Sequence, residues 1–419
     1  MSVPRDNQLY GTQTELGLGN FPLRGRTLGE LAPFVRNYVL VKLAAARANR
    51  ACGVLDEARC AAIVAAGEEV IAGNHDDQFP IPLVHGGGGT TANMNVNEVL
   101  AARASALAGV AVHPNDHVNA AQSTNDSYPT AMALTVLELV QQPVAALREL
   151  SATFERKAAE FAGTPHLGRT CLQDAVTLTA GDTHLAQAAA IDRNAAGLAA
   201  SADQLHAVPM GATAVGTGVG APQGFAQRCV QELRELTGFS LTTAENRYDS
   251  LAHLDPYAEI GAAGSRAAST MAKIAADIRL LSAGPHGGFG DLTIPARQAG
   301  SSIMPGKVNP VIPEYVMQLS YRIRGQSYTV DCAVAAGELE LNVMEPVILD
   351  ALTTIFADLT AAAEAFARRC VAGLAWDGAH RERNLAGALD NLVELAAVEG
   401  HQQVTAKNAS EPGEDRSGG

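Results

Sequence analysis

Apolar residues recur at every third or fourth position through much of the chain, which is the spacing of one face of an α-helix. The stretch 257–283 keeps this spacing throughout, at Ile260, Gly264, Ala267, Met271, Ile274, Ile278 and Leu281. Pro256 precedes the stretch and Gly284-Pro285 follows it, as expected at the two ends of a helix. The stretch 184–207 shows the same spacing. The pattern therefore predicts long helices in the middle of the chain.

The same signals predict further helices, at about 31–51, 56–73, 96–108, 128–160, 310–336 and 347–374. Pro143 predicts a kink or a break in the longest of them. A helix of about 25 residues is ~35–40 Å long, so several of them must form an elongated bundle. Their wide stripes of apolar and small residues predict that copies of the chain associate through this bundle.

The two ends of the chain lack this pattern. Residues 1–28 are predicted to be irregular and rich in turns. Residues 407–419 are rich in Gly, Ser, Glu and Pro, which predicts a disordered tail.

Composition narrows the class of protein. The 419 residues are 47% hydrophobic but only 5% aromatic, and alanine supplies much of the apolar share, which favours helices that approach closely. A net charge of −14 argues against nucleic acid or an anionic membrane surface as the main partner. We find no run of about 18 apolar residues that predicts a membrane-spanning helix. Residues 1–10 are polar and unlike a signal peptide, so we expect a cytoplasmic protein.

Six cysteines are scattered along the chain without CxxC pairs. This spacing predicts neither a zinc framework nor a small disulfide scaffold. We expect five of the six to be buried and reduced, and the sixth, Cys171, lies in a polar segment.

Three polar segments interrupt the helical pattern and carry candidate chemistry. In Gly300–Pro310, glycines bracket two serines and Lys307, which combines flexible backbone, N–H donors and a positive charge. Residues 86–89 are four glycines that precede Thr90, without the Gly-Lys-Ser/Thr ending of a phosphate loop. Residues 113–126 again place small polar groups before a helix. Each segment fits an anion site, but each also fits an ordinary turn or a set of N-caps.

A fourth glycine-rich segment, Gly216–Ala221, looks like a dinucleotide-binding motif. We find no strand–helix–strand pattern around it and therefore do not predict a nucleotide site there.

Four segments in this order resemble the aspartase/fumarase superfamily. The loop Gly300–Pro310, GSSIMPGKVNP, is similar to the superfamily's signature almost letter for letter, and it follows Gly86–Glu98, His113–Met132 and Gly168–Ala175. The likeness extends from about Tyr10 to Arg383. Short stretches resemble aspartases more than fumarases, namely Asn20–Pro22, Phe34–Arg36, Asp77–Pro80 and Leu341–Pro346.

The resemblance implies an all-α, three-domain subunit with a long central helical bundle. We predict an N-terminal helical domain at 1–112, the bundle at 113–375, a short remnant of the C-terminal domain at 376–406 and a disordered tail at 407–419. The resemblance also implies a homotetramer in which each active site is assembled from three subunits, acting on a small dicarboxylate without metal or organic cofactor.

The implied reaction removes a β-proton from a succinate-type substrate and expels the α-substituent to give fumarate. By resemblance, Ser301 is the general base, acting as an alkoxide that the loop must stabilise, and Lys307 is part of the same catalytic loop. The substrate contacts implied by the resemblance are Thr90, Ser123, Thr124, Asn125, Thr170, Cys171 and Asn309. Glu314 and Ser302 are expected to lie next to these residues and to hold them in position without contacting the substrate.

The chain departs from the superfamily pattern at three places. By resemblance, Cys171 occupies the position at which fumarases and some aspartases have a histidine. A thiol is a weaker hydrogen-bonding group than histidine. Leu16 stands where aspartases have an arginine. The chain also stops early in the C-terminal domain, which puts any lid or regulatory role of that domain in doubt.

These departures leave more than one function open. The leading hypothesis is a carbon–nitrogen lyase that releases ammonia and fumarate from aspartate. A second is a lyase for a nitro-, hydrazino- or N-substituted succinate in specialised metabolism, which Cys171 and Leu16 favour. A fumarase, or an inactive homologue with a structural role, fits the sequence less well, because Ser301 and Lys307 are both present but Cys171 replaces the histidine.

Overall fold

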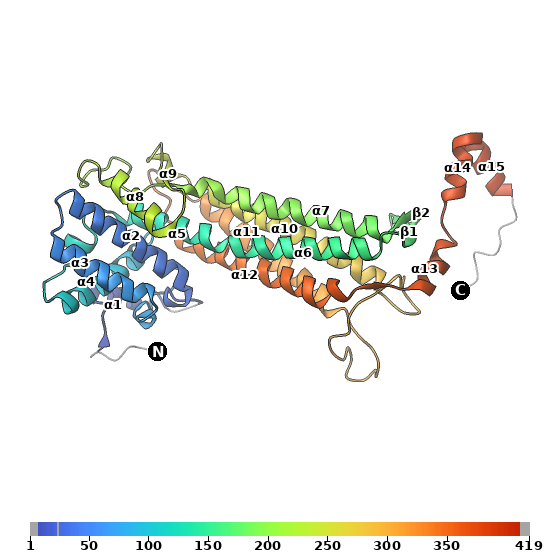
Figure 1. The fold of residues 1–419 in the computed structure, drawn as a ribbon, viewed down its shortest axis with the longest axis horizontal. Coiled ribbons are helices and arrows are strands. Elements are labelled where there is room, and N and C mark those ends of the chain that lie inside the picture. Colours follow the sequence, from blue (N-terminus) through green and yellow to red (C-terminus); the bar gives the residue numbers. More distant parts are fainter. Residues whose placement is uncertain (1–6, 23–24, 411–419) are drawn as a thin grey trace. The chain divides into compact units, whose positions relative to one another are not determined.

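The computed structural model describes residues 7–22 and 25–410, which form a mainly helical fold (Figure 1). The α-helices in chain order are α1 (Thr12–Asn20), α2 (Ala32–Ala51), α3 (Glu57–Ile71), α4 (Thr90–Ala108), α5 (Thr124–Leu139), α6 (Gln141–Glu160), α7 (Ala180–Ala202), α8 (Phe225–Thr237), α9 (Asp249–Ala252), α10 (Asp255–Leu281), α11 (Val311–Val334), α12 (Glu345–Arg369), α13 (Gly378–Leu385), α14 (Asp390–Glu399) and α15 (His401–Ser410). Short strands pair as β1 (Pro165–Thr170) with β2 (Gln173–Thr179), β3 (Ala207–Val208) with β4 (Thr242–Thr243), and β5 (Leu292–Thr293) with β6 (Ala375–Trp376). The all-α fold class is confirmed, and each helix predicted from the sequence has a counterpart.

The helix α1 corrects the prediction of irregular structure over residues 1–28. Its N-cap residue, Gly11, has no side chain to cap the helix, and Glu98 of α4 supplies the cap instead. The Glu98 carboxylate accepts the backbone N–H groups of Gly11, Gln13 and Thr14 at 2.9, 2.9 and 3.1 Å. A cap supplied from a distant helix leaves no local signal in the sequence.

Two other helices begin earlier than predicted. Helix α4 starts at Thr90 rather than at about 96, directly after Gly89 with φ +84°. Helix α5 starts at Thr124 rather than near Tyr128, because Ser123 and Asp126 form a reciprocal capping box. Thr90 and Thr124 are therefore the first residues of their helices.

The break predicted at Pro143 is present. Helix α5 ends at Leu139 and α6 begins at Gln141, so Pro143 lies in the first turn of α6. This is the end of a helix where a residue without an N–H group is tolerated, since the first N–H groups have no partner within the helix.

The glycine-rich segment Gly216–Ala221 requires a correction as well. The strands β3 and β4 pair in parallel, and α8 joins them, so a minimal strand–helix–strand unit does surround the segment. The strands have two residues each, however, and the segment neither follows β3 directly nor begins α8. This arrangement differs from the tight glycine turn that holds a pyrophosphate at a helix start.

By its contacts the chain divides into two compact units. Unit 1 comprises Met1–Ala145, Asn194–Ala268 and Leu319–Thr360, and unit 2 comprises Ala146–Arg193, Ser269–Gln318 and Ala361–Gly419. The long helices α6, α7, α10, α11 and α12 each contribute residues to both units. The domain boundaries at 112, 375 and 406 stay predictions.

The core of unit 1 is packed tightly by small residues and a few aromatic rings. The rings of Phe34, Tyr38 and Tyr128 lie 5.1–5.9 Å apart, centroid to centroid, and join α2 to α5. A Cβ atom on Gly264 of α10 would lie 2.7 Å from Ile355 of α12, so these two helices approach closely. Such contacts explain why the chain combines many alanines and glycines with few aromatic residues.

In unit 2 the helices α6, α7 and α12 surround Phe154. Its ring lies 6.0 Å from that of Phe366 and 6.1 Å from that of His184. The Ser151 hydroxyl donates to the carbonyl of Ala188, and Lys157 Nζ to that of Leu374, both at 2.8–2.9 Å. These two buried polar groups of α6 are thus paired.

Two of the helical stretches are long and apolar enough to span a membrane, Thr124–Glu160 and Glu345–Gly373. Their most apolar windows are 72% and 67% buried within the fold, as in core helices. The expectation that no stretch would pass such a test was therefore wrong, but the burial gives both helices a role in the core.

The cysteines are less uniformly buried than predicted. All six are free, and Cys60, Cys229 and Cys370 are buried as expected. Cys332 is exposed and Cys52 is half-buried, so two of the five predicted core cysteines lie outside the core of this chain.

At the C-terminal end, α15 continues through Ser410, whereas a disordered tail was predicted from residue 407. Residues 411–419 of that predicted tail lie outside the described part of the chain.

Candidate functional site

The loop Gly300–Pro310 folds around the hydroxyl of Ser301. Ser301 Oγ accepts the backbone N–H groups of Ile303 and Met304 at 3.2 and 3.1 Å. Two N–H donors on one oxygen are the arrangement that stabilises negative charge on that oxygen. The sequence-based expectation that backbone N–H groups would surround Ser301 matches this geometry.

The two ends of the loop are tied together. The N–H of Gly300 donates to the carbonyl of Lys307 at 2.8 Å, and Asn309 Nδ2 donates to the carbonyl of Gly300 at 2.9 Å. A Cβ atom on residue 300 would lie 2.7 Å from the backbone nitrogen of Asn309, so only glycine fits there. Gly306 has φ +88°, which also favours glycine.

Beyond these ties the loop is open to solvent. Ile303 is 83% exposed, and Lys307 and Ser302 are exposed as well. Between β5 and α11 the chain has no helix or strand, and Figure 1 draws this segment as a loop. An apolar side chain with this exposure in a loop with few packing contacts fits a segment that can move over a ligand.

In unit 1, the first turns of α4 and α5 carry the other predicted donors. The Thr90 hydroxyl donates to the carbonyl of Gly87 at 2.8 Å, and Thr124 Oγ1 accepts from Asn93 Nδ2 at 3.0 Å. Ser123 Oγ accepts from the N–H of Asn125, whose own Nδ2 donates to the carbonyl of Ala214. Ser123 is therefore both a helix cap and a candidate ligand, and the two roles are compatible for a hydroxyl.

The segment bearing Ser123–Asn125 is fixed by the buried carboxylate of Asp126. It accepts N–H groups from Ser123, Gly211 and Thr213 at 2.8–3.1 Å. Burial raises the pKa of Asp126 to about 6, and these N–H groups act in the opposite direction. Asp126 thus joins the start of α5 to the 211–213 turn.

In unit 2, Thr170 and Cys171 lie at the tip of the hairpin formed by β1 and β2. Thr170 pairs with Gln173, which leaves Cys171 and Leu172 as a two-residue turn with φ +53° and +60°. Non-glycine residues adopt this left-handed conformation at a cost, so the turn is strained. Cys171 is exposed there. The sequence analysis did not predict this hairpin.

A buried ion pair holds the base of this tip. Arg169 Nη1 lies 2.6 Å from Asp291 Oδ2, and the Arg169 guanidinium lies over the ring of Phe289 at 4.4 Å. The exposed fractions of the two side chains are 10% and 0%. Asn384 of α13 donates to the other oxygen of Asp291 at 2.6 Å. These residues were missed by the sequence analysis.

Two further residues were singled out in the sequence, Glu314 and Leu16. Glu314 forms an ion pair with Arg279 at 3.4 Å, with both side chains partly exposed. Leu16 of α1 is 56% exposed.

The predicted site residues therefore fall into two groups within one chain. Those in unit 1 are Thr90, Ser123, Thr124 and Asn125. Those in unit 2 are Thr170, Cys171, Ser301, Ser302, Lys307, Asn309 and Glu314.

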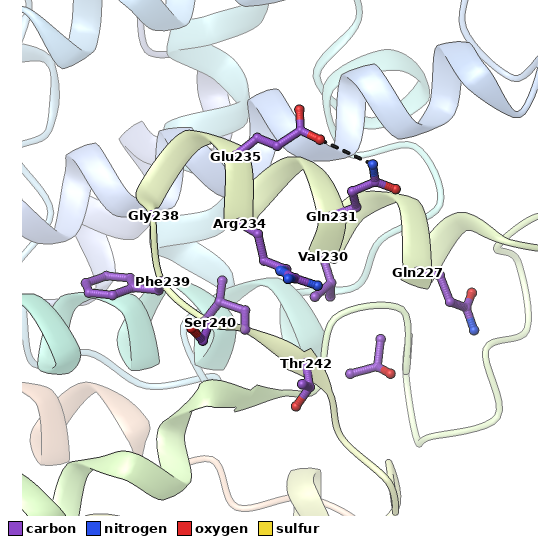
Figure 2. Close-up of a pocket in the computed structure, with 11 residues that line it drawn as sticks. Gln227, Val230, Gln231, Arg234, Glu235, Gly238, Phe239, Ser240 and Thr242 are labelled. Atoms are coloured by element: carbon purple, nitrogen blue, oxygen red, sulfur yellow. Dashed lines mark hydrogen bonds between the residues drawn. The ribbon is translucent and has the colours of Figure 1, made fainter.

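The surface pockets only partly coincide with these groups. A pocket of about 680 Å³ lies between α8 and the segment 238–243, where Gln231 donates to Glu235 at 3.2 Å (Figure 2). It contains none of the predicted site residues. A second pocket, of about 510 Å³, is lined by Thr170 together with Arg169, Leu172 and residues of α10.

The loop, the starts of α4 and α5 and the hairpin tip occur together with a match to a known family. The model of the family described as Lyase matches residues 1–325, more than half of the chain. The chain belongs to the aspartase/fumarase superfamily.

Relatives in the superfamily include both of its main enzyme types. An aspartate ammonia-lyase of a Bacillus species is 40% identical over 379 residues, which are 89% of this chain and 80% of the relative. A class II fumarate hydratase of Thermosynechococcus vestitus is 42% identical over 381 residues, which are 89% of this chain and 81% of the relative. A class II fumarase of Schistosoma mansoni has the same fold, with a TM-score of 0.93 and 32% identity over 96% of this chain and 89% of the other.

Superfamily membership makes this protein an enzyme of the lyase class. The two enzyme types are about equally similar to it, so overall identity does not select between ammonia and water as the leaving group. The choice must come from individual side chains of the site.

Proposed function

We propose that this protein is a carbon–nitrogen lyase that releases fumarate from aspartate or from an aspartate-like succinate derivative. The observation that carries the proposal is the pair of N–H groups, from Ile303 and Met304, that converge on Ser301 Oγ at 3.2 and 3.1 Å. A serine hydroxyl is too weak an acid to act as a base unless its anion is stabilised, and these donors provide that stabilisation.

In the proposed reaction, the Ser301 alkoxide takes the β-proton of the substrate. The electron pair of the broken C–H bond moves into the adjacent carboxylate, which becomes doubly negative. It then returns to form the C=C bond while the C–N bond breaks, and the nitrogen leaves with its electron pair and is protonated. A C–H group beside a carboxylate is a very weak acid, so the doubly negative intermediate must be stabilised strongly.

The remaining residues take complementary roles in the proposal. Thr90, Ser123, Thr124 and Asn125 hold the β-carboxylate and the α-substituent, at two helix starts where N–H groups and the helix dipole favour anions. Lys307 and Asn309 bind the other carboxylate. Thr170 contributes a contact from a neighbouring subunit, and Glu314 and Ser302 lie behind these groups.

The proposal includes a homotetramer whose active sites each draw residues from three subunits. Large aromatic side chains on α11 support association through the bundle. Tyr321 and Tyr328 lie seven residues apart on one helix face and are 57% and 70% exposed in the single chain. Exposed aromatic residues on one face of a long helix are typical of an interface between copies.

A nitrogen leaving group is favoured over water by the residue at the hairpin tip. By resemblance, fumarases have a histidine at the position of Cys171. The thiol of Cys171 cannot orient a water molecule as strongly as that histidine can. Cys171 is exposed in a strained turn, so its thiol is accessible at the hairpin tip.

The test is the formation of fumarate, followed by its absorbance, from aspartate and a panel of N-substituted succinates and malate. We expect turnover of at least one nitrogen compound and little or none of malate. Ser301→Ala should reduce turnover by about 10⁴-fold or more without a change in Tm, since the base is lost. Ser201→Ala on α7 is the matched control and should retain full turnover. Unchanged turnover in Ser301→Ala would overturn the assignment of the base.

A second candidate is a lyase specific for a nitro-, hydrazino- or N-alkyl succinate. The observation that favours it is again Cys171, because a thiol leaves more room and makes fewer hydrogen bonds than histidine or glutamine at this tip. Incubation with fumarate and a panel of nitrogen nucleophiles, followed by product masses, separates the candidates. A product with ammonia alone would exclude this second function.

A further inference from the structure

Lys42 of α2 is a fully buried cation. Its hydrogen-bond acceptors lie on α4 and in the segment 119–122, just before Thr124. Its side chain is 0% exposed. Its Nζ atom donates to Asn93 Oδ1 at 2.6 Å, to Asn119 Oδ1 at 3.0 Å and to Gln122 Oε1 at 3.0 Å. A buried ammonium is costly unless its N–H groups are all paired, and here three acceptors match three N–H groups.

This cage fits the charged form of Lys42. A neutral amine would direct a lone pair at one of the three amide oxygens, which would be repulsive. The titratable groups that face Lys42 are Asp126 of α5 and Cys229 of α8, and the ring of Tyr38 lies 5.2 Å from Nζ. Burial lowers the pKa of Lys42 to about 7, while Asp126 acts in the opposite direction.

The contact with Lys42 fixes the orientation of the Asn93 amide. Since Asn93 Oδ1 must face the ammonium, its Nδ2 must point the other way. Asn93 Nδ2 donates to Asn119 Oδ1 at 3.1 Å and to Thr124 Oγ1 at 3.0 Å. Both hydrogens of the amide are therefore used, and the flipped orientation would place an N–H group against Lys42.

The orientation of Asn93 in turn decides what the Thr124 hydroxyl can do. Thr124 Oγ1 accepts a hydrogen bond from Asn93, so its own hydrogen is free to be donated to another group. Among the described residues, no acceptor for that hydrogen is found. Thr124 is 8% exposed, at the first position of α5.

We propose that Lys42 is a positioning residue for catalysis: through Asn93 it holds the Thr124 hydroxyl as a hydrogen-bond donor towards the carboxylate that becomes doubly negative. This inference rests on the proposed function, in which Thr124 binds that carboxylate. The positive charge of Lys42 polarises the Asn93 amide, and a polarised chain of hydrogen bonds strengthens its last donor. The effect is greatest when the negative charge on the substrate is greatest.

A purely structural role for Lys42 predicts something different. In that case its loss would weaken all ligands alike, by loosening the packing of α2 against α4 and the 119–122 segment. A positioning role requires that the loss fall mainly on a ligand whose oxygen atoms at that position are more negative than those of a carboxylate.

The experiment compares two ligands in the full-length protein. Succinate represents the substrate before proton removal, and the nitronate of 3-nitropropionate carries its two negative oxygens where the doubly negative carboxylate forms. Lys42→Met should weaken nitronate binding by about tenfold or more, because a charge-supported donor is lost. It should change succinate binding much less. Calorimetric titration of both ligands gives the ratio directly.

A second variant tests the role of Asn93 even if Lys42→Met fails to fold. Asn93→Asp keeps a partner for Lys42 but has no N–H group to donate, so Thr124 turns its hydrogen towards the new carboxylate. Nitronate binding should fall as in Lys42→Met. The matched control is Asn95→Asp on the same helix, since the buried Asn95 donates to the carbonyl of Gln78, outside the Lys42 cage. It should keep the wild-type ratio of nitronate to succinate affinity.

The outcomes distinguish this inference from the proposed function. If the wild type forms fumarate and binds the nitronate tightly, but Asn93→Asp keeps the wild-type ratio of affinities, the positioning role is wrong and the proposed function stands. An equal loss in Asn95→Asp would also overturn the positioning role. If the wild type forms no fumarate and binds neither ligand, the proposed function fails and this inference fails with it.

Discussion

At the scale of single residues, burial opposes the charged form of a side chain even where the local structure favours it. Glu345 is the first residue of α12, where the helix dipole favours a negative charge. It is only 2% exposed, and Tyr38, Tyr128 and Tyr257 are its electrostatic neighbours. Burial raises the pKa of Glu345 well above its usual value, so desolvation outweighs the helix dipole and favours the neutral carboxyl group.

The raised pKa predicts how stability depends on pH. The folded state keeps the Glu345 proton above the unfolded pKa of about 4.3, so folded protein binds more protons and stability falls with rising pH, by up to about 1.4 kcal/mol per unit. Glu345→Gln removes this loss. The Tm of the variant should therefore rise relative to that of the wild type as the pH increases above about 5.

The control for this prediction is Glu245→Gln, which removes an exposed carboxylate. Its Tm should stay parallel to the wild-type curve. A constant difference between Glu345→Gln and the wild type across this pH range would show that Glu345 is ionised in the folded state.

At the scale of elements, the hairpin of β1 and β2 is held by partners far away in the sequence. Its two-residue turn uses Cys171 and Leu172 in a conformation that favours glycine, and such strain persists only where surrounding contacts fix it. Those contacts come from Arg169, Asp291 and Asn384. Asp390 adds a further hold, since it accepts the N–H and hydroxyl of Thr177 on β2.

We therefore expect Asn384→Ala to loosen the hairpin. It removes hydrogen bonds to Asp291 Oδ1 and to the carbonyl of Phe289, and one of these partners is a buried charge. Stability should fall by about 1–3 kcal/mol, and amide hydrogen exchange should accelerate in residues 165–179. Asn391→Ala on α14 replaces an exposed asparagine and should change neither. Unchanged exchange in the hairpin would show that α13 does not hold it.

At the scale of the whole molecule, the predicted site residues lie in two different units of the chain. The proposed homotetramer provides a way to complete each site, because identical subunits related by symmetry present different faces to a shared interface. Exposed aromatic residues on α11 and wide apolar helix faces support that assembly.

Shared sites predict complementation between inactive variants. Ser301→Ala and Thr124→Val should each be inactive, but sites that take Ser301 from one variant and Thr124 from the other should be intact. Random mixing of equal amounts restores about a quarter of the sites in a symmetric assembly. The measurement is turnover after the two proteins are unfolded together and refolded.

The control is the same treatment of each variant alone, which should recover no turnover. If the mixture is as inactive as its parts while wild-type protein recovers, Ser301 and Thr124 of one site come from the same subunit.

The sequence alone determined the long helices, the superfamily and the loop around Ser301, because each depends on residues that are neighbours in the chain. Helical periodicity extends over a few turns, and the donors to Ser301 lie two and three residues after it. Only the tertiary structure revealed the cap of α1, the hairpin tip and the Lys42 cage. Lys42 meets its partners across 51 to 80 positions of sequence, and Arg169 meets Asp291 across 122. A buried charge is stable only with such partners, and folding brings them together from separate helices.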